Sequence, residues 1–251
     1  MGGRWEIIME KPLVWAHRGA SGYCPENTLP AFEKAAEQHA DGVELDIHLT
    51  RDGAIVVTHD ERIDRVSDHK GRVYDYTLEE LKSFDFCNGN LAYEGVQIPT
   101  MGEVFDLLKP TSLMINIELK TGEIFYPGLE EKINAMTRAF GMEDRVIYSS
   151  FNHASVMHMR EINPKAATGF LYADGTLDMP AYAAAHGVNA LHPAMYNLQY
   201  PDFMEQCREK GLDVNVWTVN TEADIRECVE RGVHAVITNY PDKARRIIES
   251  C

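Results

Sequence analysis

The stretch Val43-Glu44-Leu45-Asp46-Ile47-His48-Leu49 alternates apolar and polar side chains, as a half-buried β-strand does. A helix-like run over residues 29–39 precedes it. Side chains two positions apart on a strand point to the same face, so Glu44 and Asp46 share one face and the apolar residues take the other. The sequence therefore predicts a strand that carries two carboxylates side by side, packed after a helix.

The same strand and helix pattern recurs to the end of the chain. Further strand-like runs, separated by helix-like runs and Gly-marked turns, cover residues 14–16, 113–119, 146–149, 167–171, 190–192, 214–219 and 235–238. Repeated β–α units predict a parallel sheet, and their number favours a closed TIM-type (β/α)8 barrel over an open sheet. Barrels of this length form one domain, so we predict a single domain over residues 1–251.

One segment departs from the repeat. From residue 60 to residue 110 the chain is too long for one crossover and lacks a clear strand–helix–strand order. We interpret it as an insertion that walls one side of the barrel mouth. Its aromatic residues Tyr74, Tyr76 and Phe86 are expected to be exposed there.

Composition and charge exclude several classes of protein. The net charge is −15 and no basic run is present, so nucleic-acid binding is not expected. The five cysteines are scattered and odd in number, which indicates neither a zinc site nor a disulfide framework and favours a cytoplasmic location. No apolar stretch is long enough for a signal peptide or a membrane span, so stable membrane association is not expected.

Polar residues gather where apolar runs end. His17 and Arg18 follow one such run, and His59 follows another, whereas the other histidines are dispersed. Catalytic groups of α/β barrels lie at the C-terminal ends of strands, so these residues are candidates for a site. Trp217 shares the parity of Asn215 on a later strand; it either lines the mouth or packs in the core.

A third acid joins the first two. Glu118 and Lys120 repeat the two-residue spacing on the next barrel strand. Three inward acids repel one another unless a cation neutralises them, and oxygen ligands favour Mg²⁺, Ca²⁺ or Mn²⁺ over zinc. The alternative is that Glu44, Asp46 and Glu118 form salt bridges with Lys or Arg.

An ordered set of motifs runs along the chain: His17-Arg18-Gly19, Pro25-Glu26-Asn27-Thr28, Glu44-Leu45-Asp46, His59-Asp60, Ile63-Asp64-Arg65, Asn116-Ile117-Glu118-Leu119-Lys120, Trp217-Thr218-Val219-Asn220 and Thr238-Asn239-Tyr240-Pro241. With these motifs, nearly the whole chain resembles the glycerophosphodiester phosphodiesterase family. The set is far more specific than any one motif. It also implies that the insertion is a small cap between the second and third barrel strands.

The resemblance implies the chemistry of the site. Glu44, Asp46 and Glu118 would hold one divalent ion, Mg²⁺ or Ca²⁺, with Mn²⁺ as a further possibility. His17 and His59 would form a general acid and base pair; which residue plays which role does not follow from the sequence, and we favour His17 as the base.

The charge and position of neighbouring residues suggest the substrate contacts. Arg18 and Lys120 would bind the phosphoryl oxygens, although Arg18 could instead form a structural ion pair, and Trp217 would line the pocket for the glycerol or the alcohol. Asn27 or Thr28 is expected to cap the next helix rather than to act in catalysis.

The expected reaction is hydrolysis of a small-molecule glycerophosphodiester to sn-glycerol 3-phosphate and an alcohol. One alternative is a lysophospholipase D type phosphodiesterase, and another is a noncatalytic barrel that binds phosphodiesters. The sequence does not indicate the head group or the oligomeric state.

Overall fold

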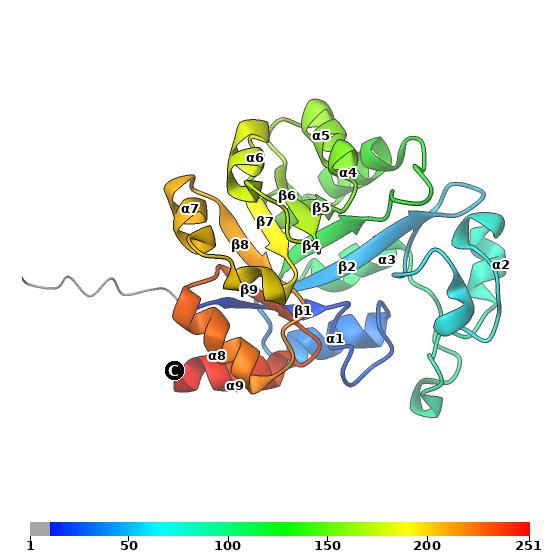
Figure 1. Cartoon of the computed structure of the whole chain (residues 1–251). Coiled ribbons are helices and arrows are strands. Elements are labelled where there is room, and N and C mark those ends of the chain that lie inside the picture. The colour runs from blue at the N-terminus through cyan, green and yellow to red at the C-terminus, as the bar shows by residue number, and fades with distance from the viewer. Residues whose placement is uncertain (1–10) are drawn as a thin grey trace, which may run out of the picture.

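Within residues 11–251, which the computed structural model describes, eight parallel strands close into a barrel (Figure 1). The barrel strands are β1 (Leu13–His17), β2 (Gly42–Leu49), β4 (Met114–Leu119), β5 (Val146–Ser150), β6 (Ala167–Tyr172), β7 (Ala190–Pro193), β8 (Asp213–Val216) and β9 (Ala235–Thr238). Strand β1 pairs with both β9 and β2, which closes the sheet. The predicted TIM-type barrel is confirmed. Residues 1–10, where the sequence indicated no apolar leader, lie outside the described residues.

Helices surround the barrel as an outer layer (Figure 1). They are α1 (Leu29–Glu37), α3 (Met101–Leu108), α4 (Leu129–Phe140), α5 (His153–Ile162), α6 (Met179–His186), α7 (Phe203–Glu209), α8 (Glu222–Arg231) and α9 (Pro241–Ser250), with short 3₁₀ turns η4 (Glu143–Arg145) and η5 (Met195–Gln199). The apolar face of β2 is buried beneath this layer, in one cluster with Phe32 of α1 and Phe105 of α3. Strand alternation therefore leaves the polar residues of β2 facing the barrel interior.

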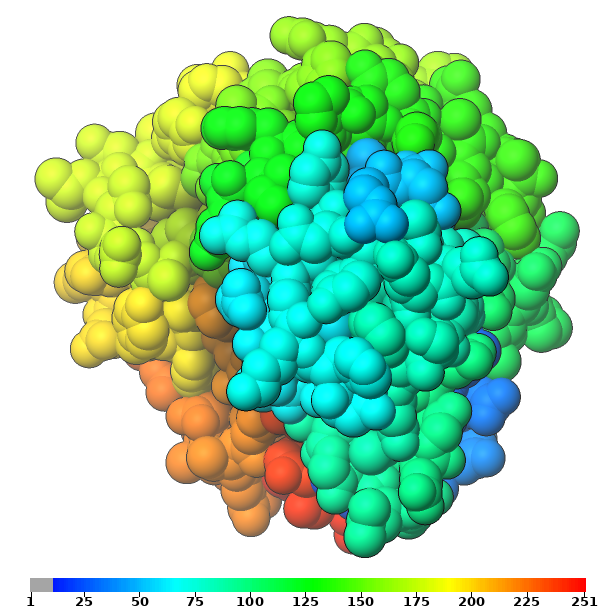
Figure 2. Space-filling view, turned by 90° about the vertical axis from the view of Figure 1, so that its right-hand side faces the viewer, coloured from blue at the N-terminus to red at the C-terminus, as the bar shows by residue number. Residues whose placement is uncertain are grey.

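The insertion follows a strand that is not part of the barrel. Strand β3 (Ile55–Val57) pairs antiparallel with β2. After it come η1 (Ile63–Arg65), η2 (Val73–Asp75), α2 (Leu78–Lys82) and η3 (Leu91–Tyr93). In Figure 2 these cyan to teal residues form one continuous patch over the face that is shown.

A small apolar core holds the insertion together. Its buried residues are Val56, Ile63, Val66, Val73, Leu81, Phe86 and Ile98. Phe86 is only 3% exposed and Tyr76 is partly buried, so the expectation that both would be exposed is wrong; Tyr74 is 48% exposed. The aromatic rings that looked available to a substrate are mostly used to stabilise the segment.

Helix α3 marks where the insertion ends. Thr100 and Glu103 form a capping box at its start, and its buried residues belong to the barrel core. The part of the segment with its own core therefore ends before Met101 rather than at residue 110. None of the helices over residues 11–251 is both long and apolar enough to cross a bilayer.

Candidate active site

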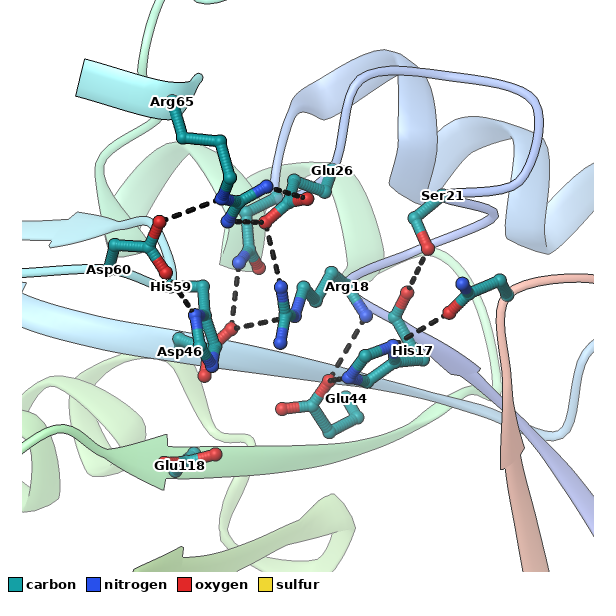
Figure 3. A network of polar contacts seen from close by, with 12 residues as sticks. His17, Arg18, Ser21, Glu26, Glu44, Asp46, His59, Asp60, Arg65 and Glu118 are labelled. Atoms are coloured by element: carbon teal, nitrogen blue, oxygen red, sulfur yellow. Dashed lines mark hydrogen bonds and ion pairs between the residues drawn. The ribbon is translucent and has the colours of Figure 1, made fainter. Parts of the chain in front are cut away.

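Three buried carboxylates meet on two neighbouring strands. Strands β2 and β4 are in a register that places Asp46 beside Glu118, and Glu44 lies two residues before Asp46 on the same face. One carboxylate oxygen from each of the three lies within 4.8 Å of the others. Figure 3 shows them together, with Glu44 and Asp46 on one strand and Glu118 on the next. All three side chains thus lie together on the inward face that their two-residue spacing predicted.

Electrostatics at this cluster are unfavourable without a cation. Burial, with Asp46 and Glu118 nearby, raises the pKa of Glu44 well above its usual value. Burial also raises the pKa of Glu118. Burial disfavours the charged form of Asp46 too, but interactions with His59, Lys120 and Arg18 hold its pKa well below the usual range.

The donor set fits a hard divalent ion. All three groups offer carboxylate oxygens, and Asp46 Oδ1 is buried with no hydrogen-bond partner. A buried carboxylate oxygen without a partner carries a desolvation cost that a bound cation would remove.

Two cationic side chains adjoin the acids. Lys120 Nζ lies 2.9 Å from Glu118 Oε1 and 3.8 Å from Asp46 Oδ1. The Arg18 backbone N–H donates to Glu44 Oε2 at 3.0 Å, and its guanidinium Nε lies 3.7 Å from Asp46. The ion pairs that the sequence offered as an alternative are thus present, and two of the paired residues, Arg18 and Glu118, also line the cavity between the two histidines.

A tight turn sets the direction of Arg18. Arg18 has a φ of 56° and Gly19 a φ of 76°, both in the left-handed region. A Cβ atom at Gly19 would lie 2.6 Å from the backbone carbon of Ala31, so only glycine fits against the helix that follows.

His17 is oriented by a residue from the far end of the chain. Its Nδ1 lies 2.7 Å from Asn239 Oδ1, and a carbonyl oxygen only accepts, so Nδ1 carries the proton and Nε2 keeps its lone pair. Nε2 lies 3.9 Å from Glu44 Oε2. Burial, together with neighbouring Arg18, lowers the pKa of His17 to about 4. At neutral pH this imidazole is uncharged and ready to accept a proton.

His59 has a different partner. Its Nδ1 donates to Asp60 Oδ1 at 2.6 Å, and its Nε2 lies 3.3 Å from Lys120 Nζ. A carboxylate therefore holds the His59 ring, in contrast to the neutral amide that holds His17.

His59 does not reach the site from the end of a barrel strand, as its place after residues 55–58 suggested. Strand β3 runs antiparallel to β2 and returns the chain toward the acids, and Thr58 N–H donates to the Asp46 backbone carbonyl at 3.1 Å.

The two histidines line a cavity with one charged and one apolar side. Arg18, Glu44 and Glu118 lie on the charged side, and the apolar side is formed by Phe151, Leu171, Trp217 and Ile237. The Trp217 ring meets Phe151 edge to face at 5.5 Å, and its Nε1 donates to the backbone carbonyl of His192 at 2.8 Å. Trp217 therefore lines the cavity and is anchored by a neighbouring strand at the same time.

Two asparagines lie in the site although the sequence interpretation gave Asn27 a different role and Asn239 none. Asn27 does not cap α1: its Nδ2 donates to Asp46 Oδ2 at 2.8 Å, and it has a φ of 55°. Thr28 occupies the cap position without a side-chain cap bond, because its hydroxyl donates to Pro25. Asn239 belongs to a motif at the end of a predicted strand, and that position was the sign in the sequence that it could lie near the site.

Comparisons with known proteins point to one family. The model of the glycerophosphoryl diester phosphodiesterase family matches residues 17–243. A glycerophosphodiester phosphodiesterase of Caldanaerobacter subterraneus subsp. tengcongensis is 40% identical over 233 residues, which cover 92% of this chain and 96% of that protein.

Two solved structures are similar to this chain over nearly its whole length. The structure of a glycerophosphodiester phosphodiesterase from Agrobacterium tumefaciens has a TM-score of 0.82 and 25% identity, and the match covers 96% of this chain and 100% of the other. An Oleispira antarctica phosphodiesterase in complex with the product sn-glycerol-3-phosphate has a TM-score of 0.83 and 28% identity, with coverage of 95% and 97%.

Proposed function

The chain belongs to the glycerophosphoryl diester phosphodiesterase family, and from this premise we propose that it hydrolyses glycerophosphodiesters to sn-glycerol 3-phosphate and an alcohol. The observation that carries the proposal is the pair of differently partnered histidines, His17 and His59, on one cavity beside the cluster of three buried acids. Such an arrangement provides a proton acceptor, a proton donor and a cation site for one phosphodiester.

Glu44, Asp46 and Glu118 would hold one divalent cation, with Mg²⁺ or Ca²⁺ as the proposed ion and Mn²⁺ as an alternative. When bound, such an ion polarises a phosphoryl oxygen and offsets the charge that develops on it. Burial of all three acids supports this role, because exposed carboxylates would gain less from an ion.

His17 is proposed as the general base. Its Nε2 takes the proton of the attacking hydroxyl, which belongs either to water or to the glycerol moiety, while the oxygen of that hydroxyl forms a bond to phosphorus. In the second case, water then opens the cyclic phosphodiester to give sn-glycerol 3-phosphate. Asn239 supports this role because it keeps the proton of the neutral ring on Nδ1. The pKa of His17, lowered by burial, keeps the base unprotonated at neutral pH.

His59 is proposed as the general acid. As the bond between phosphorus and the alcohol oxygen breaks, its Nε2 gives that oxygen a proton, and Asp60 holds the ring in place through Nδ1. This role requires Lys120 to turn away from Nε2, since a protonated nitrogen cannot accept from an ammonium group. Lys120 and Arg18 would then bind the phosphoryl oxygens that are not reacting.

The apolar side of the cavity would hold the glycerol or the alcohol carbon atoms against Trp217 and Phe151. The cytoplasm is the proposed compartment. Its support is the sequence pattern of the cysteines, all five of which are free in the structure.

The test compares two leaving groups. Wild type, His17→Ala and His59→Ala are assayed on glycerophosphocholine and on a glycerophosphate nitrophenyl ester, whose nitrophenolate leaves without a proton. Both variants should lose about 10²- to 10⁴-fold in kcat on glycerophosphocholine, and only His59→Ala should recover on the nitrophenyl ester. Wild type without activity on any glycerophosphodiester would refute the proposed function, and recovery of His17→Ala instead would reverse the two roles.

A further inference from the structure

A network of charged groups connects the insertion to His59 and to Arg18, and Arg65 lies at its centre. Arg65 ends the η1 turn of the insertion. Its Nε donates to Asp60 Oδ2 at 2.8 Å, and its two terminal nitrogens donate to the two oxygens of Glu26 at 2.7 and 2.8 Å (Figure 3). One guanidinium thus holds two carboxylates that come from different segments of the chain.

Each of those carboxylates holds a residue that faces the substrate. Asp60 accepts from His59 Nδ1 at 2.6 Å through its other oxygen, and Glu26 accepts from Arg18 Nη1 at 2.9 Å. Figure 3 shows Arg65 above His59 and Arg18, with Asp60 and Glu26 between. Arg65 is therefore one residue removed from both the proposed acid and a proposed phosphate-binding cation.

We propose that Arg65 is a positioning residue that fixes His59 through Asp60 and Arg18 through Glu26. The inference rests on the proposed function, since it gives Arg65 a part in the same reaction. It also gives the insertion a role beyond forming a wall: this segment supplies the group that orders the catalytic side chains.

The geometry of Arg65 distinguishes it from an ordinary surface ion pair. Exposed pairs contribute little on average, and the Arg65 side chain is 45% exposed. Its contact with Glu26, however, is bidentate, and Glu26 is only 14% exposed, which are the conditions under which a charge-assisted bond is strong and directional. A lysine presents a single point charge and cannot hold both carboxylates in this planar arrangement.

The loss of Arg65 should affect kcat through His59 and KM through Arg18. In Arg65→Met, Asp60 loses its second partner and His59 loses its fixed orientation, so proton donation to the leaving group suffers. We expect kcat on glycerophosphocholine to fall about 10- to 100-fold, and kcat on the nitrophenyl ester to change by less than about 3-fold. The freed Arg18 should raise KM for both substrates.

A matched control lies three residues away. Arg62 is also an arginine of the insertion, is 54% exposed and pairs with Asp64 at 3.1 Å. Arg62→Met removes an exposed ion pair of the same segment without touching the site. Its kcat and KM should equal those of the wild type on both substrates.

The experiment measures kcat and KM of wild type, Arg62→Met, Arg65→Met, Asp60→Asn and the Asp60→Asn/Arg65→Met double variant on both substrates, with thermal melting to check folding. Adding Arg65→Met to Asp60→Asn should cause no further loss of kcat on glycerophosphocholine. If Arg65→Met does not melt cooperatively, Arg65→Lys takes its place and should show the same dependence on the leaving group.

Equal losses of kcat on both substrates, additive losses in the double variant, or unchanged kinetics of the Arg65 variants would each overturn the inference. Such results would leave the proposed function intact, because wild-type turnover is measured in the same series.

Discussion

Replacing Asn239 by alanine tests whether this residue fixes the tautomer and orientation of His17, the proposed base. In the structure His17 Nδ1 has this one side-chain acceptor, at 2.7 Å, and the ring is buried deeply enough that its pKa falls to about 4. In Asn239→Ala the Nδ1 proton has no partner. The ring is then more stable with its proton on Nε2, or after it has turned. With either change, the Nε2 lone pair of His17 is no longer available to the attacking hydroxyl.

The size of the effect follows from that lost bond. Leaving a buried N–H without a partner costs about 1–3 kcal/mol, and this penalty falls on the productive tautomer of His17. Converted to a rate, the penalty is about a 5- to 150-fold decrease in kcat. Because the base acts on the nucleophile, the decrease should be the same for glycerophosphocholine and for the nitrophenyl ester.

The assay is steady-state kinetics on both substrates, with Ser21→Ala as the control. Ser21 Oγ donates at the same distance, 2.7 Å, but to the backbone carbonyl of His17 and not to its ring. Its loss should change kcat by less than about 3-fold, because the tautomer is untouched. Wild-type kcat in Asn239→Ala, or a loss confined to glycerophosphocholine, would refute the assignment of His17 as an oriented base.

Three further predictions concern the insertion and the cysteines. Tyr74→Ala, at a position 48% exposed, should change the ratio of kcat/KM among choline, ethanolamine and glycerol head groups; equal losses on all three would contradict a role in selection. Phe86→Ala, at 3% exposure, should instead lower the free energy of unfolding by about 3–5 kcal/mol, and an unchanged urea midpoint would show that the insertion core does not matter. Burial raises the pKa of Cys207 and of Cys228 to about 12, so both thiols stay protonated at pH 8. Dithionitrobenzoate should react with exposed Cys251 at once, and with Cys207 and Cys228 only after unfolding. Rapid reaction of all three thiols would contradict the burial of Cys207 and Cys228.

The acids could be located from sequence because strand alternation is a local rule. Glu44 and Asp46 are two residues apart on β2, and the same rule places Glu118 inward on β4; only the strand register, Asp46 beside Glu118, had to be supplied by the fold. The barrel itself was predictable for a similar reason, since each β–α unit is visible by itself and only their number had to be interpreted.

The partners of the histidines could not be located in this way. Asn239 is 222 residues from His17 in sequence and reaches it because β9 pairs with β1 when the barrel closes. Arg65 and Glu26 are 39 residues apart and meet only because the insertion folds back over the first loop. No local pattern encodes contacts of this kind.

The insertion was the least predictable part. Its elements are three to five residues long, too short to show a helical or strand period, so Phe86 could not be recognised as a core residue. The antiparallel return of β3, which delivers His59 to the acids, was likewise hidden, because three apolar residues do not indicate the direction in which a strand pairs.

The central claim is that this chain is a phosphodiesterase whose three buried acids act through a divalent cation. The most direct measurement is the release of sn-glycerol 3-phosphate from glycerophosphocholine by protein treated exhaustively with a chelator, before and after Mg²⁺, Ca²⁺ or Mn²⁺ is restored. We predict that turnover is lost on chelation, returns with at least one of the three ions, and requires a higher ion concentration in Glu44→Gln and Asp46→Asn. Undiminished turnover after chelation would contradict the claim.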